Sequence, residues 1–244
     1  MFALLKAIFY TPLYNGLIFL IGILPGHSVG AAVILFTLFV KLLLSPLSHK
    51  AAKFQLEMKS HEAELNKIKE QYKDDKQAQG KAVLDFYKEK KINPFAAIVP
   101  LFIQIPIVIS LYYIFSRAGL PEVNADLLYG FVHAPVPDIH FFGINMMSKN
   151  LILAVCAGIA QFLQAHFAMP PAPPKSESPS FGNDLARGMH LQTKYFLPVL
   201  MGFVSYAASG AVALYFITSS LFAIAQETIV RKSLVKGHRE NTQS

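Results

Sequence analysis

Three long apolar stretches constrain the fold of this chain more than any other feature. They cover residues 29–47, 95–116 and 150–168, and each is close to the length of about 20 residues that an α-helix needs to cross the hydrocarbon core of a bilayer. The composition agrees, because 53% of the 244 residues are hydrophobic and only 15% are charged, a balance that is too apolar for an ordinary soluble domain. The sequence therefore predicts an integral membrane protein.

A fourth apolar stretch, residues 195–226, is too long for one span and is interrupted near its middle by Ser209 and Gly210. We predict two short helices joined by a tight turn, which stand nearly upright in the bilayer or are surrounded by a thinned bilayer. The predicted fold class is therefore all-α, a polytopic membrane protein with five transmembrane helices. The predicted spans are 27–48, 95–116, 149–168, 194–208 and 211–228, and the other segments are a cytoplasmic hairpin over 49–94, an external loop over 117–148, a cytoplasmic loop over 169–193 and a basic cytoplasmic tail over 229–244.

The basic residues predict which ends of the spans face the cytoplasm. Of the 22 lysines and arginines, eleven lie in 49–94, three in 169–194 and four in the tail, whereas the opposite side holds Lys6, Arg117 and Lys149. Cytoplasmic loops of membrane proteins carry the excess of basic residues. We therefore expect the N-terminus outside, the C-terminus in the cytoplasm and an odd number of spans.

Residues 1–26 are apolar but interrupted by Pro12, Asn15 and Gly16. A sixth span and the apolar region of a signal peptide are both possible interpretations of this segment. The residues Val-Gly-Ala at 29–31 form a poor cleavage site, deep in what the pattern predicts as the first span. We favour an uncleaved helix that lies at the outer interface of the membrane.

The charged segment 49–94 has the pattern of two amphipathic helices. Its apolar residues recur at helical spacings, the charged residues at 73–76 interrupt the pattern, and the Asn-Pro pair at 93–94 ends it. We predict a helical hairpin, which is either a solvated coiled-coil spacer or a docking arm for a polypeptide or partner protein. The apolar residues are Phe54, Met58, Leu65, Ile68 and Tyr72 in the first half and Val83, Phe86 and Tyr87 in the second.

Lys41 is a cation inside the first predicted span. Thr37 lies four residues before it and Ser45 four residues after it, so the three side chains share one face of a helix. One interpretation is that the long lysine stem carries the charge to the cytoplasmic headgroups. That interpretation does not explain Thr37, which lies deeper on the same face, and we favour a polar environment inside the bundle.

The other predicted spans also carry polar residues at helical spacings. Each pair alone is typical of hydrogen bonds between transmembrane helices, but their presence in four of five short spans indicates a wet cavity inside the bilayer. The candidate groove residues are Thr37, Lys41, Ser45, Gln104, Tyr112, Gln161, Gln164, Tyr215 and Ser219.

Three stretches of the chain resemble the YidC, Oxa and Alb family of membrane protein insertases. VILFTLFVKLLLSPLSHKA at 33–51 is similar to the first core span of the family, KINPFAAIVPLFIQIPIVISLYYIF at 91–115 to the second, and HLQTKYFLPVLMGFVSYAASGAVALYFITSSLFAIAQE at 190–227 to the last two. The resemblance follows the family's order from about residue 10 to residue 231 and includes the hairpin. The chain is thus identified as a bacterial member of the YidC type, in a short form without the large external domain.

The resemblance implies a five-helix bundle around a hydrophilic groove that is open to the cytoplasm and to lipid and closed to the outside. In the family's pattern Lys41 stands at the place of an arginine, Thr37 matches a threonine, and three further residues match positions that face the groove: Gln104, Gln164 and Tyr215. Lysine lacks the bidentate fork of arginine, so we expect Lys41 to attract carboxylates by charge more than by geometry.

The function that the resemblance implies is insertion of client transmembrane segments from the cytoplasm into the bilayer, without ATP hydrolysis. We expect no catalytic residue and no enzyme activity, because the sequence has no GxxxxGK[ST], HExxH or GxSxG motif. Cys156 is the single cysteine, which excludes an internal disulfide and a CxxC metal site, and we expect no metal or cofactor. Two alternatives stay open: a secondary transporter or channel subunit, although inverted repeats are not seen, and a membrane tether or assembly factor that acts through the hairpin.

The expected partners are nascent membrane proteins and membrane lipids in the bacterial plasma membrane, with the ribosome, its targeting receptor and the Sec translocon as further candidates. The formal charge of +7 does not indicate DNA binding, because the basic residues lie between apolar runs and not on the face of a folded domain. Ribosomal RNA is a polyanion, so a ribosome or partner contact is predicted for the tail, where the alternative is ordinary positive-inside anchoring. The residues concerned are Arg231, Lys232, Lys236 and Arg239.

Overall fold

The computed structural model describes residues 6–93, 99–116, 120, 122–168 and 191–242. For residues 55, 56, 59, 76, 100, 101, 116 and 231–242 it describes the backbone alone. The described chain is mainly helical, which confirms the predicted fold class, and it adds one short pair of antiparallel strands. In chain order the elements are η1 (Lys6–Tyr10), α2 (Thr11–Ile23), η2 (Pro25–His27), α3 (Val29–Leu43), α4 (Ser45–Ser60), α5 (Glu62–Gln71), α6 (Lys76–Glu89), α7 (Val99–Ser116), η4 (Ala125–Leu127), β1 (His140–Phe141), β2 (Ile144–Asn145), α8 (Leu151–Ala168), η5 (Gln192–Phe196), α10 (Leu197–Ala208) and α11 (Gly210–Thr242).

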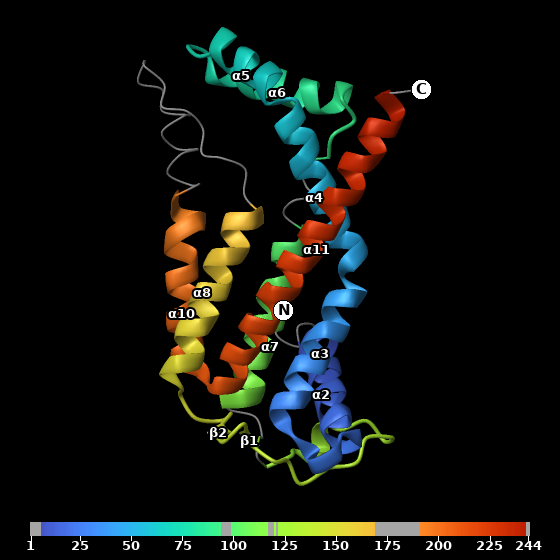
Figure 1. The fold of residues 1–244 in the computed structure, drawn as a ribbon, viewed down its shortest axis with the longest axis vertical. Helices are drawn as coiled ribbons and strands as arrows, with labels where there is room; N and C mark the ends of the chain where they lie inside the picture. Colours follow the sequence, from blue (N-terminus) through green and yellow to red (C-terminus); the bar gives the residue numbers. More distant parts are fainter. Residues whose placement is uncertain (1–5, 94–98, 117–119, 121, 169–190, 243–244) are drawn as a thin grey trace.

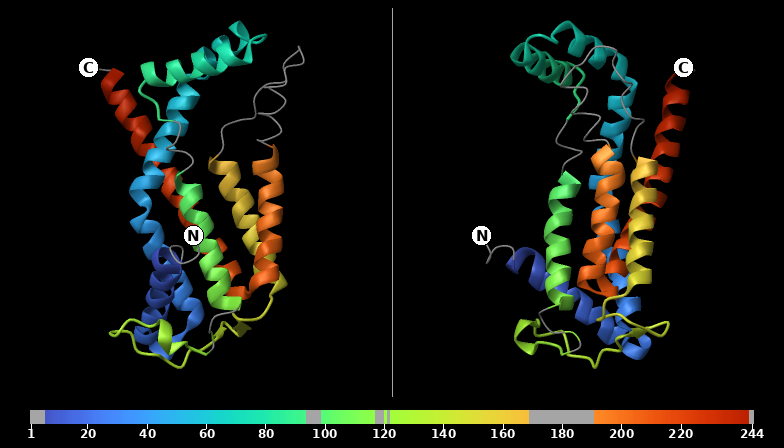
Figure 2. Two further views of the ribbon diagram at one scale, coloured as in Figure 1. Left: turned by 180° about the vertical axis from the view of Figure 1, so that it is seen from behind. Right: turned by 90° about the vertical axis from the view of Figure 1, so that its left-hand side faces the viewer.

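The helices form an elongated bundle with α5 and α6 at one end and the strand pair at the other (Figure 1). Helix α11 is central, because it contacts α3, α4, α7, α8 and α10. Seen from behind, α7 lies in front of α11 and between α3 and the α8–α10 pair (Figure 2). Apolar side chains from α2, α3, α7 and α11 meet in one continuous core, whose most deeply buried members include Tyr14, Ile18, Val29, Ile114 and Phe216.

Three helices in the described part of the chain are long and apolar enough to cross a bilayer: Lys6–Ile23, Leu151–Ala168 and Gly210–Val230. A fourth crossing results if the bent pair Val29–Leu43 and Ser45–Phe54 is one span, and Phe102–Phe115 is a shorter apolar helix. The five-span count stays a prediction. So does the interfacial placement of residues 1–26, since the helix Lys6–Ile23 has the length of a span.

The first predicted span, 27–48, is bent in the structure. Helix α3 ends at Leu43, α4 begins at Ser45, and the two axes differ by 58°. The cause lies at Pro46, which has no N–H to donate to the carbonyl of residue 42 and whose ring is tolerated only in the first turn of a helix. We did not expect this bend from the apolar pattern.

The predicted turn at Ser209 and Gly210 separates α10 from α11. Ser209 is extended, with φ of −167° and ψ of 166°. Gly210 lies so close to the loop before α8 that a Cβ there would be 3.4 Å from the Cα of Met146. Helix α11 does not stop at residue 228, where the span was expected to end, but continues to Thr242. The basic tail is therefore an extension of the last helix.

The loop between α7 and α8 covers the end of the bundle opposite the hairpin (Figure 1). The side-chain oxygen of Asn15 accepts a hydrogen bond from the N–H of Tyr129 at 2.6 Å, and its amide donates to the carbonyl of Leu127 at 2.8 Å. At the start of α11, the N–H of Gly210 donates to Ser148 O and the N–H of Ala211 to Met146 O, both at 2.8 Å. The loop thus satisfies backbone donors that a helix N-terminus leaves without partners.

The two halves of the predicted hairpin pack against each other through their apolar stripes. Leu65, Phe86 and Ile92 form a small buried core, and other stripe residues surround it, whereas Tyr72 lies outside this cluster. Asp75 caps α6 by accepting from the N–H groups of residues 77 and 78, which explains the break at 73–76.

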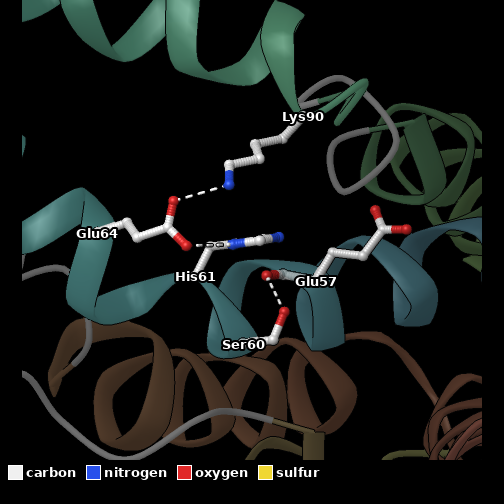
Figure 3. A network of polar contacts seen from close by, with 5 residues as sticks. All are labelled: Glu57, Ser60, His61, Glu64 and Lys90. Carbon is white, nitrogen blue, oxygen red and sulfur yellow. Dashed lines mark hydrogen bonds and ion pairs between the residues drawn. The ribbon is translucent and has the colours of Figure 1, made fainter. Parts of the chain in front are cut away.

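A polar network closes the hairpin beside this core (Figure 3). Glu64 accepts from Lys90 Nζ at 2.8 Å and contacts His61 Nδ1 at 3.1 Å, while the rings of His61 and Phe86 meet edge to face. Both partners favour the carboxylate, with Lys90 the stronger, so the pKa of Glu64 is lowered, and Glu64 raises the pKa of Lys90. The network joins α5 to the residue that ends α6.

Candidate functional site

Three of the predicted groove residues form a chain of hydrogen bonds between three helices. Lys41 of α3 donates from Nζ to Gln104 Oε1 on α7 at 3.3 Å, and Gln104 donates from Nε2 to the hydroxyl oxygen of Tyr215 on α11 at 2.5 Å. Tyr215 is buried, and Lys41 and Gln104 are half-buried. The structure therefore brings together polar side chains that are 63 and 111 residues apart in the sequence.

Lys41 has a neutral partner and no carboxylate partner in the part of the chain that the structure describes. An amide oxygen positions an ammonium group but does not neutralise it. A half-buried cation of this kind keeps a strong attraction for an incoming anion, because Coulomb interactions are less screened away from bulk water. The arrangement is chemically suited to receive a carboxylate.

The remaining members of the Lys41 stripe have different surroundings. Thr37 is 1% exposed and donates its hydroxyl to Val33 O of its own helix at 2.6 Å. Ser45 lies at the bend and accepts from Gln226 Nε2 at 2.9 Å, and the same nitrogen donates to the Ser45 carbonyl at 3.2 Å. Gln226 was not among the predicted site residues, although its position seven residues after Ser219 places both on one face of α11 and was a signal that could have identified it.

Helix α11 carries further buried hydroxyl groups near Tyr215. Ser219 is 5% exposed and lies one turn after Tyr215 on the same helix, and Thr218 donates to the carbonyl of Leu214 at 2.8 Å. Ser220 is fully buried, and its Oγ is the one buried side-chain polar atom without a hydrogen-bond partner among the described residues. This turn of α11 is therefore polar inside an apolar helix.

The structure does not join the other predicted groove residues to Lys41. Tyr112 on α7 is 38% exposed and packs edge to face with Tyr113. Gln161 and Gln164 lie half-buried on α8, which packs on α10 and α11. Their assignment to a groove stays a prediction, as does the role of the basic tail residues, whose side chains lie outside the described ones: Arg231, Lys232, Lys236 and Arg239.

Comparison with known proteins gives one family. A family model described as 60Kd inner membrane protein matches residues 20–237. Curated relatives named membrane protein insertase YidC, from Francisella tularensis subsp. novicida (strain U112), subsp. holarctica (strain LVS) and subsp. tularensis (strain SCHU S4 / Schu 4), are each 30% identical over 211 residues, which is 86% of this chain and 34% of the relative. The chain thus spans about a third of the length of the curated relatives it matches.

The matched region contains the bend, the hairpin and all three residues of the Lys41–Gln104–Tyr215 chain. Together with the apolar helices, the match identifies a multi-pass protein of the bacterial inner membrane. It also confirms the resemblance seen in the sequence: the chain belongs to the 60Kd inner membrane protein family, to which the YidC insertases belong.

Proposed function

We propose that the chain is a membrane protein insertase in which the Lys41 site receives the polar flank of a client transmembrane segment from the cytoplasm. The observation that carries the proposal is the half-buried ammonium group held by the amide oxygen of Gln104, with no described carboxylate to neutralise it. Ionisable side chains inside membrane helices usually pair with an opposite charge or with backbone carbonyls, and neither kind of partner is present for Lys41 among the described residues. Lys41 instead keeps its charge available for a client.

The loop at the end of the bundle opposite the hairpin supports a client groove that is closed to the outside. The loop residues 122–150 are held to α2 through Asn15 and to the first turn of α11 through Ser148 and Met146. We infer that the client groove ends at this loop, which allows a client tail to enter without a continuous pore. We infer the corresponding topology: N-terminus outside and C-terminus in the cytoplasm.

The energetics require no ATP. A charged group at the bilayer centre costs several kcal/mol, and a cationic polar site lowers that barrier for an acidic tail. Burial of the client's own apolar segment in lipid then drives the step. We propose nascent membrane proteins as the clients, and the ribosome, its targeting receptor and the Sec translocon as partners that deliver them.

The test uses the purified protein alone, reconstituted in liposomes without nucleotide, and a single-span client with either an acidic or a neutral tail. We expect Lys41→Arg to insert both clients, whereas Lys41→Met lowers insertion of the acidic-tail client about tenfold, the loss of one charge-assisted contact of about 1.5 kcal/mol. The neutral-tail client is the internal control and changes little. Equal activity of Lys41→Arg and Lys41→Glu would show that the lysine is structural.

A second variant separates insertion from tethering. The hairpin is exchanged for an unrelated helical hairpin of the same length while the bundle is left intact. An insertase keeps its liposome activity and its sensitivity to position 41. A tether that acts through the hairpin would give the opposite result. The exchanged protein would lose activity, and Lys41→Met in the protein with its own hairpin would have no effect.

A further inference from the structure

A recess with a volume of about 430 Å³ lies where the bend between α3 and α4 faces α11. Its volume is within the range of about 300–1,000 Å³ typical of small-molecule sites. The recess is mostly apolar and is lined by Leu42, Ser45, His49, Phe222, Ala225, Gln226, Ile229 and Val230.

We propose that this recess binds one phospholipid with an anionic headgroup. The acyl chain lies along Leu42 and Ile229, and the phosphate lies at the mouth beside His49 and Lys50. The site needs only that α11 crosses the bilayer, so it does not depend on the insertase activity proposed above.

The apolar wall of the recess faces the membrane. Leu42 is 61% exposed and Ile229 is 68% exposed, and exposed apolar side chains on a transmembrane helix are covered by lipid. Ile229 and Val230 are the last residues of the apolar segment Gly210–Val230. The recess therefore lies where the hydrocarbon region gives way to the headgroups.

The size of the recess favours a lipid over a client helix. Its α11 wall extends from residue 222 to residue 230, about 12 Å along a helix axis, whereas a segment that crosses the bilayer is about 30 Å long. Ser45 and Gln226 in the wall already hydrogen-bond to each other. The recess thus offers a short apolar surface without a row of unpaired polar groups.

A lysine next to the recess favours an anionic headgroup. Lys50 follows the lining residue His49 on α4, both are exposed, and no described carboxylate pairs with either. Lys53, on the next turn, is paired with Glu57 at 3.7 Å, and Glu227 beside the recess has an interaction partner of its own. A cationic side chain near an anionic lipid surface enriches such lipids about five-fold.

The absence of tryptophan from the chain gives the experiment a clean background. Ile229→Trp is reconstituted in phosphatidylcholine vesicles that contain phosphatidylglycerol, and the bromine quencher is placed on one lipid or on the other. Brominated phosphatidylglycerol should quench this tryptophan about five-fold more effectively, per mole, than brominated phosphatidylcholine. Val199→Trp is the matched control, because Val199 is 73% exposed in the first turn of α10 and lies away from the recess.

Lys50→Gln in the Ile229→Trp protein should remove most of the preference, and the same substitution in the Val199→Trp protein should change nothing. Equal quenching by the two lipids at position 229, as at position 199, would mean ordinary bulk lipid and would overturn the proposal. Quenching by neither lipid would mean that polypeptide covers the recess, and would overturn it as well.

Discussion

At the scale of single residues, Gln104 determines what Lys41 can bind. An amide oxygen at 3.3 Å from the ammonium nitrogen holds the cation in place and leaves its charge intact. The other end of the same amide donates to Tyr215, which is buried in α11 and therefore fixes the amide's orientation. A carboxylate in place of the amide would keep the geometry and remove the net charge.

We therefore predict that Gln104→Glu impairs insertion of acidic-tail clients about as strongly as Lys41→Met, roughly tenfold, because a charge-assisted pair of about 1.5–3 kcal/mol competes with the client. Liposome insertion of acidic-tail and neutral-tail clients measures the effect. Gln104→Met, which removes the amide but adds no charge, is the control and should retain more activity. A Gln104→Glu protein with normal activity would contradict the role of a free positive charge.

The sequence revealed residues of the site whose chemistry is unusual for their surroundings. Lys41, Gln104 and Tyr215 were predictable because each is polar within an apolar run. Gln226 was missed because it follows a segment that is already becoming polar. Asn15 was interpreted only as an interruption, although it is 2% exposed and joins α2 to the loop after α7, since a contact across more than 100 residues leaves no local pattern.

At the scale of elements, local patterns predicted the helices and tertiary contacts decided their bends and ends. The break at 73–76 and the turn at Ser209 follow from charge, capping and conformational preference. The bend at Leu44 depends on Pro46 and on the contact of Ser45 with α11. The spacing of apolar residues carries no information about either of them. The hairpin contains a titratable pair that joins its two helices, Glu64 and Lys90.

We predict that the hairpin loosens in acid. The pKa of Glu64 is lowered by Lys90 and by His61, so its stabilising contribution is present above the ordinary pKa of about 4.3 and is lost as the pH falls through the lowered value. The pKa of Lys90 is raised by Glu64, so its contribution persists at neutral pH and is lost only in strong base. Spin labels at exposed positions 67 and 88, in a Cys156→Ala background, report the distance between α5 and α6.

The expected result is a single narrow distance distribution at pH 7 that broadens below about pH 4. Glu64→Gln is the matched control, because glutamine at this position does not titrate. Its distance distribution should therefore be similar at pH 7 and below about pH 4. A distribution that stays narrow in acid in the unmodified hairpin would show that the apolar core of Leu65, Phe86 and Ile92 holds the two helices together alone.

At the scale of the whole molecule, α11 connects the loop end of the bundle, the Lys41 site and the lipid recess. Its first turn binds the loop that closes one end, Tyr215 belongs to the Lys41 site, Gln226 lines the lipid recess, and the helix then continues to Thr242. Its 33 residues correspond to about 50 Å, well beyond the hydrocarbon thickness of about 30 Å. The C-terminal end therefore leaves the bundle on the side of the hairpin (Figure 1).

We propose that this projection lets the basic tail contact translating ribosomes. The helix continues for about 18 Å beyond residue 230. It carries Arg231 and Lys232 next to the end of the apolar segment, and Lys236 and Arg239 further out. Truncation after Val230 should weaken co-sedimentation with ribosomes at low salt and reduce the slope of log affinity against log salt by up to about four, since each phosphate contact contributes about 0.9.

A full-length variant with glutamine at positions 231, 232, 236 and 239 keeps the helix and separates charge from length. Unchanged binding of both variants at low salt would assign the tail to membrane anchoring, and binding of the intact chain that is insensitive to salt would eliminate an electrostatic contact.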